Sequence, residues 1–109
     1  MARINGAELV VTANAADFAA RLVSVPTAGT PVQLPSLPIP DGFSCTVRAS
    51  ENNGTKRIYL SNSSVNALDA TKRIELRKAG SVELQITNTN LIWIDASANL
   101  AEVEILVEQ

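Results

Sequence analysis

Histidine is absent from this sequence of 109 residues, and cysteine occurs only once. Without histidine, the chain lacks the side chain that proteins use most often as a general base and as a metal ligand. Catalytic sites of the Ser-His-Asp and Cys-His types are therefore excluded, and one cysteine cannot supply the usual four ligands of a structural zinc site. Cys45 alternates in phase with apolar neighbours, so we expect it to be a small buried hydrophobic residue.

Long apolar runs, glycine-rich loops and a strong net charge are also missing. No apolar stretch approaches the roughly 20 residues that cross a bilayer, and we expect neither a membrane span nor a signal peptide. The five glycines are scattered singly, which is typical of turns and not of a phosphate-binding loop. The formal net charge of −2 opposes sequence-independent binding to phosphate backbones. We therefore expect no cofactor and no metal, and neither nucleic acid nor membrane as a partner.

The sequence is instead rich in alternating apolar and polar residues. Hydrophobic residues make up 46% of the chain, and its length is that of one domain. Period-two alternation places one set of side chains on a buried face of a strand. The predicted strands cover residues 43–49, 57–61, 73–77, 81–87, 91–95 and 102–108.

Two of these strands are expected to form a hairpin. Ala79 and Gly80 separate residues 73–77 from residues 81–87, and a short turn between two alternating segments is typical of an antiparallel pair. Residues 91–95 are apolar on both faces. This pattern predicts either a central strand or a strand that a partner covers.

The first third of the chain is more ambiguous. Residues 9–12 and 21–25 have the β-branched content of strands, whereas residues 17–22 could instead form a helical turn because Ala and Leu favour helix. In total, seven to eight short antiparallel strands predict an all-β fold, a single β-sandwich of Greek-key or jelly-roll type. We expect one domain overall, with residues 1–22 as an N-terminal strand or arm and residues 23–109 as the sandwich.

All five prolines lie between Val25 and Asp41. Proline has no N–H to donate to a sheet ladder, so we expect an extended segment along a sheet edge or across the surface. Two compatible interpretations stay open. The segment could be a long crossover between two sheets, or an arm that grips a neighbouring subunit.

Charge is segregated along the chain. Residues 48–78 hold seven Lys or Arg against three Asp or Glu, whereas residues 79–109 hold five carboxylates and no basic residue. Unlike charges that are partitioned within one small domain can direct head-to-tail or symmetric self-association.

Three glutamates, Glu102, Glu104 and Glu108, share one face of the last predicted strand. Same-face neighbours on a strand lie about 7 Å apart. That spacing would suit a glycosidase pair or a hard cation. The simpler interpretation is the solvated outer face of an antiparallel sheet, and we expect no catalytic residue here.

Trp93 is the only tryptophan. Ile92 and Ile94 fill one face of their strand, so Trp93 and Leu91 point to the other. Tryptophan often anchors interfaces. The pattern therefore favours packing in the core or at a subunit interface over a ligand site.

Several turn and strand motifs follow one another in order. They are Thr27-Ala28-Gly29-Thr30-Pro31-Val32-Gln33-Leu34-Pro35, Ile39-Pro40-Asp41-Gly42-Phe43, Arg48-Ala49-Ser50-Glu51-Asn52-Asn53-Gly54, Arg57-Ile58-Tyr59-Leu60, Lys78-Ala79-Gly80-Ser81-Val82-Glu83-Leu84 and Leu91-Ile92-Trp93-Ile94-Asp95-Ala96. This order resembles that of small tailed-bacteriophage virion proteins, some of which are capsid decoration (cement) proteins. The resemblance covers residues 23–108. It departs at Ala79, where proline is usual, at Trp93, where tyrosine is usual, and at residues 61–71, which have no obvious counterpart.

The resemblance implies a non-enzymatic virion structural protein that binds the outer surface of an assembled capsid and clamps adjacent subunits. Its partners would be the major capsid protein and further copies of itself in a homotrimer. Its location would be the exterior of a virion that assembles in the host cytoplasm. The residues expected at the subunit or capsid interface are Trp93, Leu91, Pro26, Pro31, Pro35, Pro38 and Pro40.

Two other classes of function stay open. A receptor- or glycan-binding module of a phage neck, tail or head fibre would display an exposed aromatic residue. A small hydrolase that works with Asp and Glu alone would need a cleft with two carboxylates, one of them with a raised pKa.

Overall fold

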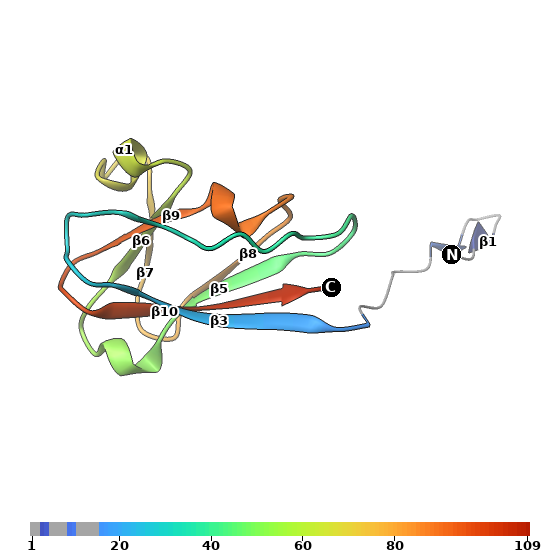
Figure 1. The fold of residues 1–109 in the computed structure, drawn as a ribbon, viewed down its shortest axis with the longest axis horizontal. Coiled ribbons are helices and arrows are strands. Elements are labelled where there is room, and N and C mark those ends of the chain that lie inside the picture. Colours follow the sequence, from blue (N-terminus) through green and yellow to red (C-terminus); the bar gives the residue numbers. More distant parts are fainter. Residues whose placement is uncertain (1–2, 5–8, 11–15) are drawn as a thin grey trace.

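The structure, a computed structural model, describes residues 3–4, 9–10 and 16–109. Two antiparallel four-stranded sheets form a small β-sandwich, which confirms the predicted all-β fold class (Figure 1). Sheet one contains, in spatial order, β3 (Phe18–Val25), β10 (Ala101–Glu108), β5 (Cys45–Ala49) and β8 (Ser81–Leu84). Sheet two contains β4 (Val32–Gln33), β9 (Trp93–Ala96), β6 (Ile58–Ser61) and β7 (Ile74–Leu76).

The other elements are short. They are the paired strands β1 (Arg3–Ile4) and β2 (Leu9–Val10), the helix α1 (Ser64–Ala67) and the 3-10 helices η1 (Glu51–Asn53) and η2 (Thr89–Leu91). No helix in the part of the chain that the structure describes is long and apolar enough to cross a membrane.

The strands pair in a nested order. β3 pairs with β10, β4 with β9, β5 with β8 and β6 with β7, and every pair is antiparallel. Two further antiparallel pairings, β5 with β10 and β6 with β9, join these pairs within each sheet. The beginning and the end of the sandwich therefore lie side by side, although about eighty residues separate them in sequence.

The predicted hairpin between residues 73–77 and 81–87 is wrong. β7 pairs with β6 in sheet two, whereas β8 pairs with β5 in sheet one. The turn between them crosses from one sheet to the other and is held by β5. The N–H of Ala79 donates to the carbonyl of Ala49 at 2.9 Å, and the N–H of Ala49 donates to the carbonyl of Gly80 at 2.9 Å. The local sequence indicated a turn, but long-range pairing decided which strands became neighbours.

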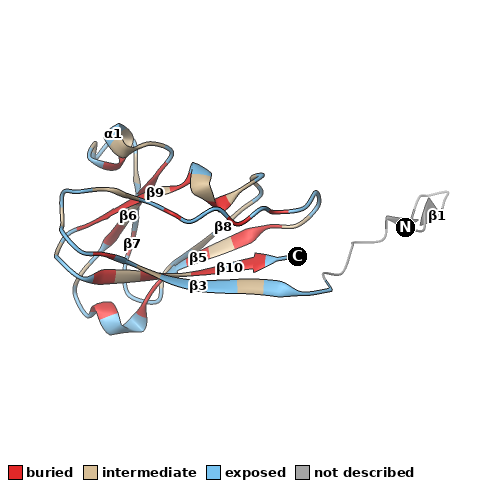
Figure 2. Cartoon of the chain, viewed as in Figure 1, coloured by how far each residue is buried: buried red, intermediate tan, exposed pale blue. Residues whose placement is uncertain are grey.

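The inward side chains of the two sheets form one core. Figure 2 shows buried residues, in red, along strands of both sheets. The predicted buried faces of β5 and β10 are confirmed, because each of the following side chains is at most 1% exposed: Cys45, Val47, Ala49, Val103, Ile105 and Val107. Burial of the Val and Ile side chains among them contributes about 1.5–3 kcal/mol each. This core is what holds the two sheets together.

β3 is a strand, and the helical alternative for residues 17–22 is not observed. All eight of its residues pair with β10. The expected division between residues 1–22 and 23–109 therefore falls inside a strand, and the sandwich begins at Phe18. Of the predicted strand at residues 9–12, Leu9–Val10 is observed, and the remainder lies outside the described residues.

The proline-rich stretch is a crossover between the two sheets. It leaves β3, adds the edge strand β4 to sheet two and then leads to β5 in sheet one. Leu34, Leu37 and Ile39 point into the core. The prolines face outward, with Pro31 half-buried and the other four exposed. The predicted position at a sheet edge is confirmed, since β4 pairs only with β9.

Asn53 joins η1 to the first residues of β10. Its Oδ1 accepts the N–H of Glu102 at 2.8 Å, and its Nδ2 donates to the carbonyl of the same residue at 2.9 Å. The side-chain amide thus satisfies both backbone groups of Glu102, as a neighbouring strand would. The sequence pattern had indicated only a turn here, and Gly54 supplies it with a φ of 62°.

We expect Asn53→Ala to lower the free energy of unfolding by about 1–2 kcal/mol, because the partly buried N–H of Glu102 loses its partner. The carbonyl of Glu102 keeps a second partner, the N–H of Ser50, at 3.0 Å. Urea denaturation measures this change. Asn52→Ala is the matched control, since the Asn52 side chain is exposed, and it should change stability by less than about 0.5 kcal/mol. Equal effects of the two substitutions would show that the amide contacts contribute nothing.

Candidate functional site

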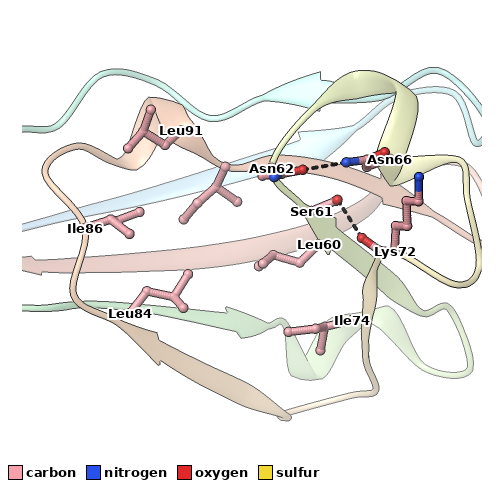
Figure 3. A pocket seen from close by; sticks show the side chains of 10 residues that line it. Leu60, Ser61, Asn62, Asn66, Lys72, Ile74, Leu84, Ile86 and Leu91 are labelled. Carbon is pink, nitrogen blue, oxygen red and sulfur yellow. Dashed lines mark hydrogen bonds between the residues drawn. The ribbon is translucent and has the colours of Figure 1, made fainter.

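An apolar groove of about 610 Å³ opens between the edges of the two sheets (Figure 3). Strands β6 and β7 of sheet two form one side, and β8 of sheet one with the residues that follow it forms the other. Leu91 at the end of η2 and Ile92, which precedes β9, close the groove. Six apolar side chains line it: Leu60, Ile74, Leu84, Ile86, Leu91 and Ile92.

The rim of the groove exposes large apolar side chains. Ile74 is 50% exposed and Leu91 is 51% exposed, whereas Leu60 and Ile92 on the floor are buried. Ile74 pairs directly with Leu60, so it belongs to the inward face of sheet two. It is exposed because β7 and β8 are edge strands of different sheets and do not pair with each other. Clustered exposed apolar side chains of this kind mark binding surfaces.

One end of the groove is polar. The hydroxyl of Ser61 donates to the carbonyl of Lys72 at 2.8 Å, and Nδ2 of Asn66 donates to Oδ1 of Asn62 at 2.8 Å. The side chain of Lys72 lies at the same end (Figure 3). The groove therefore combines apolar walls with one polar end. Protein-binding surfaces commonly combine an apolar area with polar residues at its border.

Residues 61–71 build this polar end. The hydroxyl of Ser63 caps α1 by accepting the N–H of Asn66 at 3.1 Å. Asp69 then closes a turn, because its Oδ1 accepts both the hydroxyl of Thr71 at 2.7 Å and the N–H of Thr71 at 2.9 Å. These bonds hold the pKa of Asp69 below its usual value. The segment that had no counterpart in the sequence resemblance thus shapes one end of the groove.

The residues predicted at an interface are only partly brought together. Leu91 lies on the rim of the groove, whereas Trp93 is half-buried and does not line it. Of the predicted strand at residues 91–95, only the part from Trp93 onward is in β9, because Leu91 ends η2. The expectation of a central strand is confirmed for β9, which lies between β4 and β6. Among the prolines, Pro35 is fastened to η2, since its carbonyl accepts the hydroxyl of Thr89 at 2.6 Å. Pro26, Pro31, Pro38 and Pro40 lie elsewhere along the crossover. An interface role for all seven of the predicted residues stays a prediction.

The carboxylates of the last strand lie on the outer face of sheet one. Glu102, Glu104 and Glu108 alternate with the buried side chains of β10. Glu104 is paired with Arg48, whose Nε and Nη2 lie 2.7 and 2.6 Å from its Oε1. An exposed pair of this kind contributes at most about 1 kcal/mol. Within residues 16–109, no group of three or more Cys, Asp or Glu side chains is placed to hold a metal ion.

Two buried side chains, those of Cys45 and Asp95, have structural roles. Cys45 is fully buried, as predicted, and burial raises the pKa of its thiol, which disfavours the nucleophilic thiolate. Asp95, which the sequence analysis did not single out, is 3% exposed, and its Oδ1 accepts the N–H of Gly29 at 2.8 Å. It holds the start of the crossover against β9. Its signal in the sequence was a carboxylate within an otherwise apolar strand.

Sequence reasoning missed most of the groove. The predicted hairpin has three inward-facing residues here: Ile74, Leu84 and Ile86. Pairing in that hairpin would place them beside each other in one sheet. The observed pairing places Ile74 in sheet two and Leu84 in sheet one. No periodicity distinguishes a strand with a paired edge from one with an open edge, so the sequence carried no signal for the groove.

No protein-family model matches this chain, and no curated protein sequence matches it. Among solved structures, the IMPa metallopeptidase from Pseudomonas aeruginosa matches with a TM-score of 0.55 and 10% identity, over 89% of this chain and 13% of the peptidase chain. The same peptidase in complex with an O-glycopeptide matches with a TM-score of 0.53 and 11% identity, over 90% of this chain and 13% of that one. This chain thus spans about an eighth of the peptidase, and the likeness shows a shared fold alone.

A third solved structure comes from Bacillus endospore appendages, described as a family of disulfide-linked pili. It matches with a TM-score of 0.43 and 12% identity, over 95% of this chain and 98% of that chain. A TM-score of that size is too low to show a shared fold.

Proposed function

We propose that this chain is a non-enzymatic structural protein of a tailed-bacteriophage virion, which binds the outer surface of the assembled capsid and stabilises it by clamping adjacent subunits. The observation that carries the proposal is the apolar groove, with Ile74 and Leu91 half-exposed on its rim. Exposing such side chains to water is unfavourable in a free monomer, and a protein partner that covers them recovers the hydrophobic free energy.

The strand order supports the same proposal. The nested pairs of β3 with β10, β4 with β9, β5 with β8 and β6 with β7 support the proposal that this sandwich is an eight-stranded jelly roll. Jelly rolls recur in viral capsid proteins and in lectin domains. Since one fold serves many functions, the order of motifs that resembles phage virion proteins is the second support.

The groove suggests how a clamp would act. An extended segment of the major capsid protein could place apolar side chains on Leu84 and Ile86 and form main-chain hydrogen bonds with the open edge of β7 or β8. Binding that occurs only on the assembled shell stabilises that shell by mass action. The stabilisation is about 2.7 kcal/mol per site when the free concentration of this protein is about one hundred times Kd. A homotrimer placed at a capsid three-fold position would multiply this effect.

A receptor- or glycan-binding module is the second candidate, and one observation favours it. Phe18 is 64% exposed on the outer face of sheet one. The other large aromatic side chains are less available for stacking. Trp93 is half-buried, and the guanidinium of Arg73 lies 3.6 Å from the ring centroid of Tyr59. Capsid binding is therefore the better supported proposal.

The copy number per purified particle tests this assignment. We expect about one copy per copy of the major capsid protein, or about one trimer per capsid three-fold position, because a clamp must occupy every equivalent site. Quantitative mass spectrometry of purified particles measures the ratio. A few to a few dozen copies per particle would contradict capsid decoration and support the fibre, neck or tail candidate. Absence from particles would overturn both.

A further inference from the structure

The outer end of β10, near Glu108, carries an acidic and apolar notch. The notch has a volume of about 420 Å³, and Phe18 and Leu106 form its apolar walls. The carboxylates of Asp17 and Glu108 lie beside them. Phe18 is 64% exposed and Leu106 is 43% exposed, which is unusual for the outer face of a small soluble sandwich.

The opposite end of the sandwich carries a basic concavity. It has a volume of about 290 Å³ and lies between the loop after η1 and the turn after β7. Four cationic side chains line it: Lys56, Arg57, Arg77 and Lys78. One carboxylate, Glu75, pairs with Arg57 at 3.6 Å and with Arg77 at 3.2 Å. The concavity therefore keeps an excess of three positive charges.

The two features are fastened to opposite ends of the same strand. The amide of Asn53, next to the basic concavity, is hydrogen-bonded to Glu102 at the start of β10. The N–H of Asp17, in the notch, donates to the carbonyl of Gln109 just after its end, at 2.9 Å. Glu108 lies six positions after Glu102, which corresponds to about 20 Å along a strand. One copy therefore presents opposite charges at its two ends.

We propose that copies of this chain associate head to tail, with the basic concavity of one copy seated on the acidic notch of the next. Lys and Arg suit the notch because their aliphatic stems can pack on Phe18 and Leu106 while their charged heads reach the two carboxylates. Like ends repel, so a symmetric end-to-end dimer is disfavoured. A head-to-tail contact closes into a ring or continues as a filament. The inference concerns the free chain and does not depend on capsid binding.

Charge exchange tests the pairing of these two surfaces. The acidic-end variant is Asp17→Asn with Glu108→Lys, where asparagine keeps an oxygen that can accept the N–H of Phe18 as Asp17 does. The basic-end variant is Lys56→Glu with Lys78→Glu. Sedimentation velocity of the purified chain measures association, and circular dichroism verifies that each variant is folded.

We expect the unmodified chain to associate at low salt, and at least about tenfold more weakly in 0.5 M NaCl, where the Debye length falls to a few ångströms. Each variant alone should associate at least about tenfold more weakly than the unmodified chain, because one of its two ends then meets a like charge. An equimolar mixture of the two variants should recover association, since unlike ends are again available. Asp41→Lys, an exposed site outside both surfaces, should associate as the unmodified chain does.

Three results would overturn the inference. The first is an unmodified chain that stays monomeric at several hundred micromolar and low salt. The second is a variant that associates undiminished by itself. The third is a mixture that fails to recover association, which would show that the two surfaces do not pair with each other. None of these results involves particles, so they are distinct from a failure of the proposed capsid binding.

Discussion

Replacing Ile74 and Leu91 together by aspartate is expected to abolish the proposed binding of this protein to capsids while its fold persists. Each side chain is about half-exposed in the free chain, so burial of the exposed halves by a partner contributes about 1 kcal/mol or more per residue. A carboxylate at either position would lose that gain and would also have to be desolvated. Together these effects weaken the free energy of binding by at least about 3 kcal/mol, which raises Kd roughly a hundredfold.

Cosedimentation with particles that lack the protein measures this loss. The matched control is Val65→Asp with Leu68→Asp, because these side chains are 75% and 53% exposed around α1 but do not line the groove. The control introduces the same charges into the same fold and should bind as the unmodified chain does. Binding that is equal in both double variants would exclude the groove as the capsid-binding surface.

Thr89→Val is expected to cost about 1–3 kcal/mol of stability, although the two side chains have the same shape. The hydroxyl of Thr89 donates to the carbonyl of Pro35 at 2.6 Å and accepts the N–H of Leu37 at 3.0 Å. The N–H of Leu37 also donates to Oδ1 of Asn88 at 3.1 Å and so keeps a partner in the variant, whereas the carbonyl of Pro35 loses the hydroxyl of the fully buried Thr89. A buried group that loses its partner costs about 1–3 kcal/mol. These bonds hold the proline-rich crossover against η2.

Thermal unfolding measures this effect. For a domain of this size, each kcal/mol lowers Tm by about 4–8 °C. Thr87→Val, the same exchange at an exposed site two residues away, should leave Tm nearly unchanged. Thr89→Ser keeps the hydroxyl and should lose less stability than Thr89→Val. If serine and valine destabilise equally, packing of the methyl group and not hydrogen bonding fastens the crossover.

Strand positions and their buried faces could be predicted because they depend on local alternation. Val103, Ile105 and Val107 are buried while the intervening glutamates face outward, as the period-two pattern indicated. Residues 21–25 of β3 likewise followed from β-branched content, whereas the first part of this strand lies in residues 17–22, which also allowed a helical turn. Alternation works here because successive strand side chains point to opposite faces, whichever strand lies alongside.

Strand partners could not be predicted in the same way. The turn at Ala79 was read correctly as a turn, yet it joins two sheets, because β5 holds it through hydrogen bonds from and to Ala49. The groove is a direct consequence of this crossing between sheets. Ile74 and Leu84 line the open edges of two different sheets and do not lie beside each other in one hairpin. The candidate site thus depended on the one pairing that the local pattern misassigned.

The sequence by itself determined that this protein is a small β-sandwich without histidine chemistry, with an extended proline-rich segment and segregated charge. Its local periodicities are sufficient for this because they specify each strand's buried face. Only the tertiary structure decided which strands pair, where an apolar edge stays open and that the opposite charges lie at opposite ends of β10. Those features arise from contacts between residues far apart in the chain, whose free energies depend on the whole packed core and leave no trace in a local pattern.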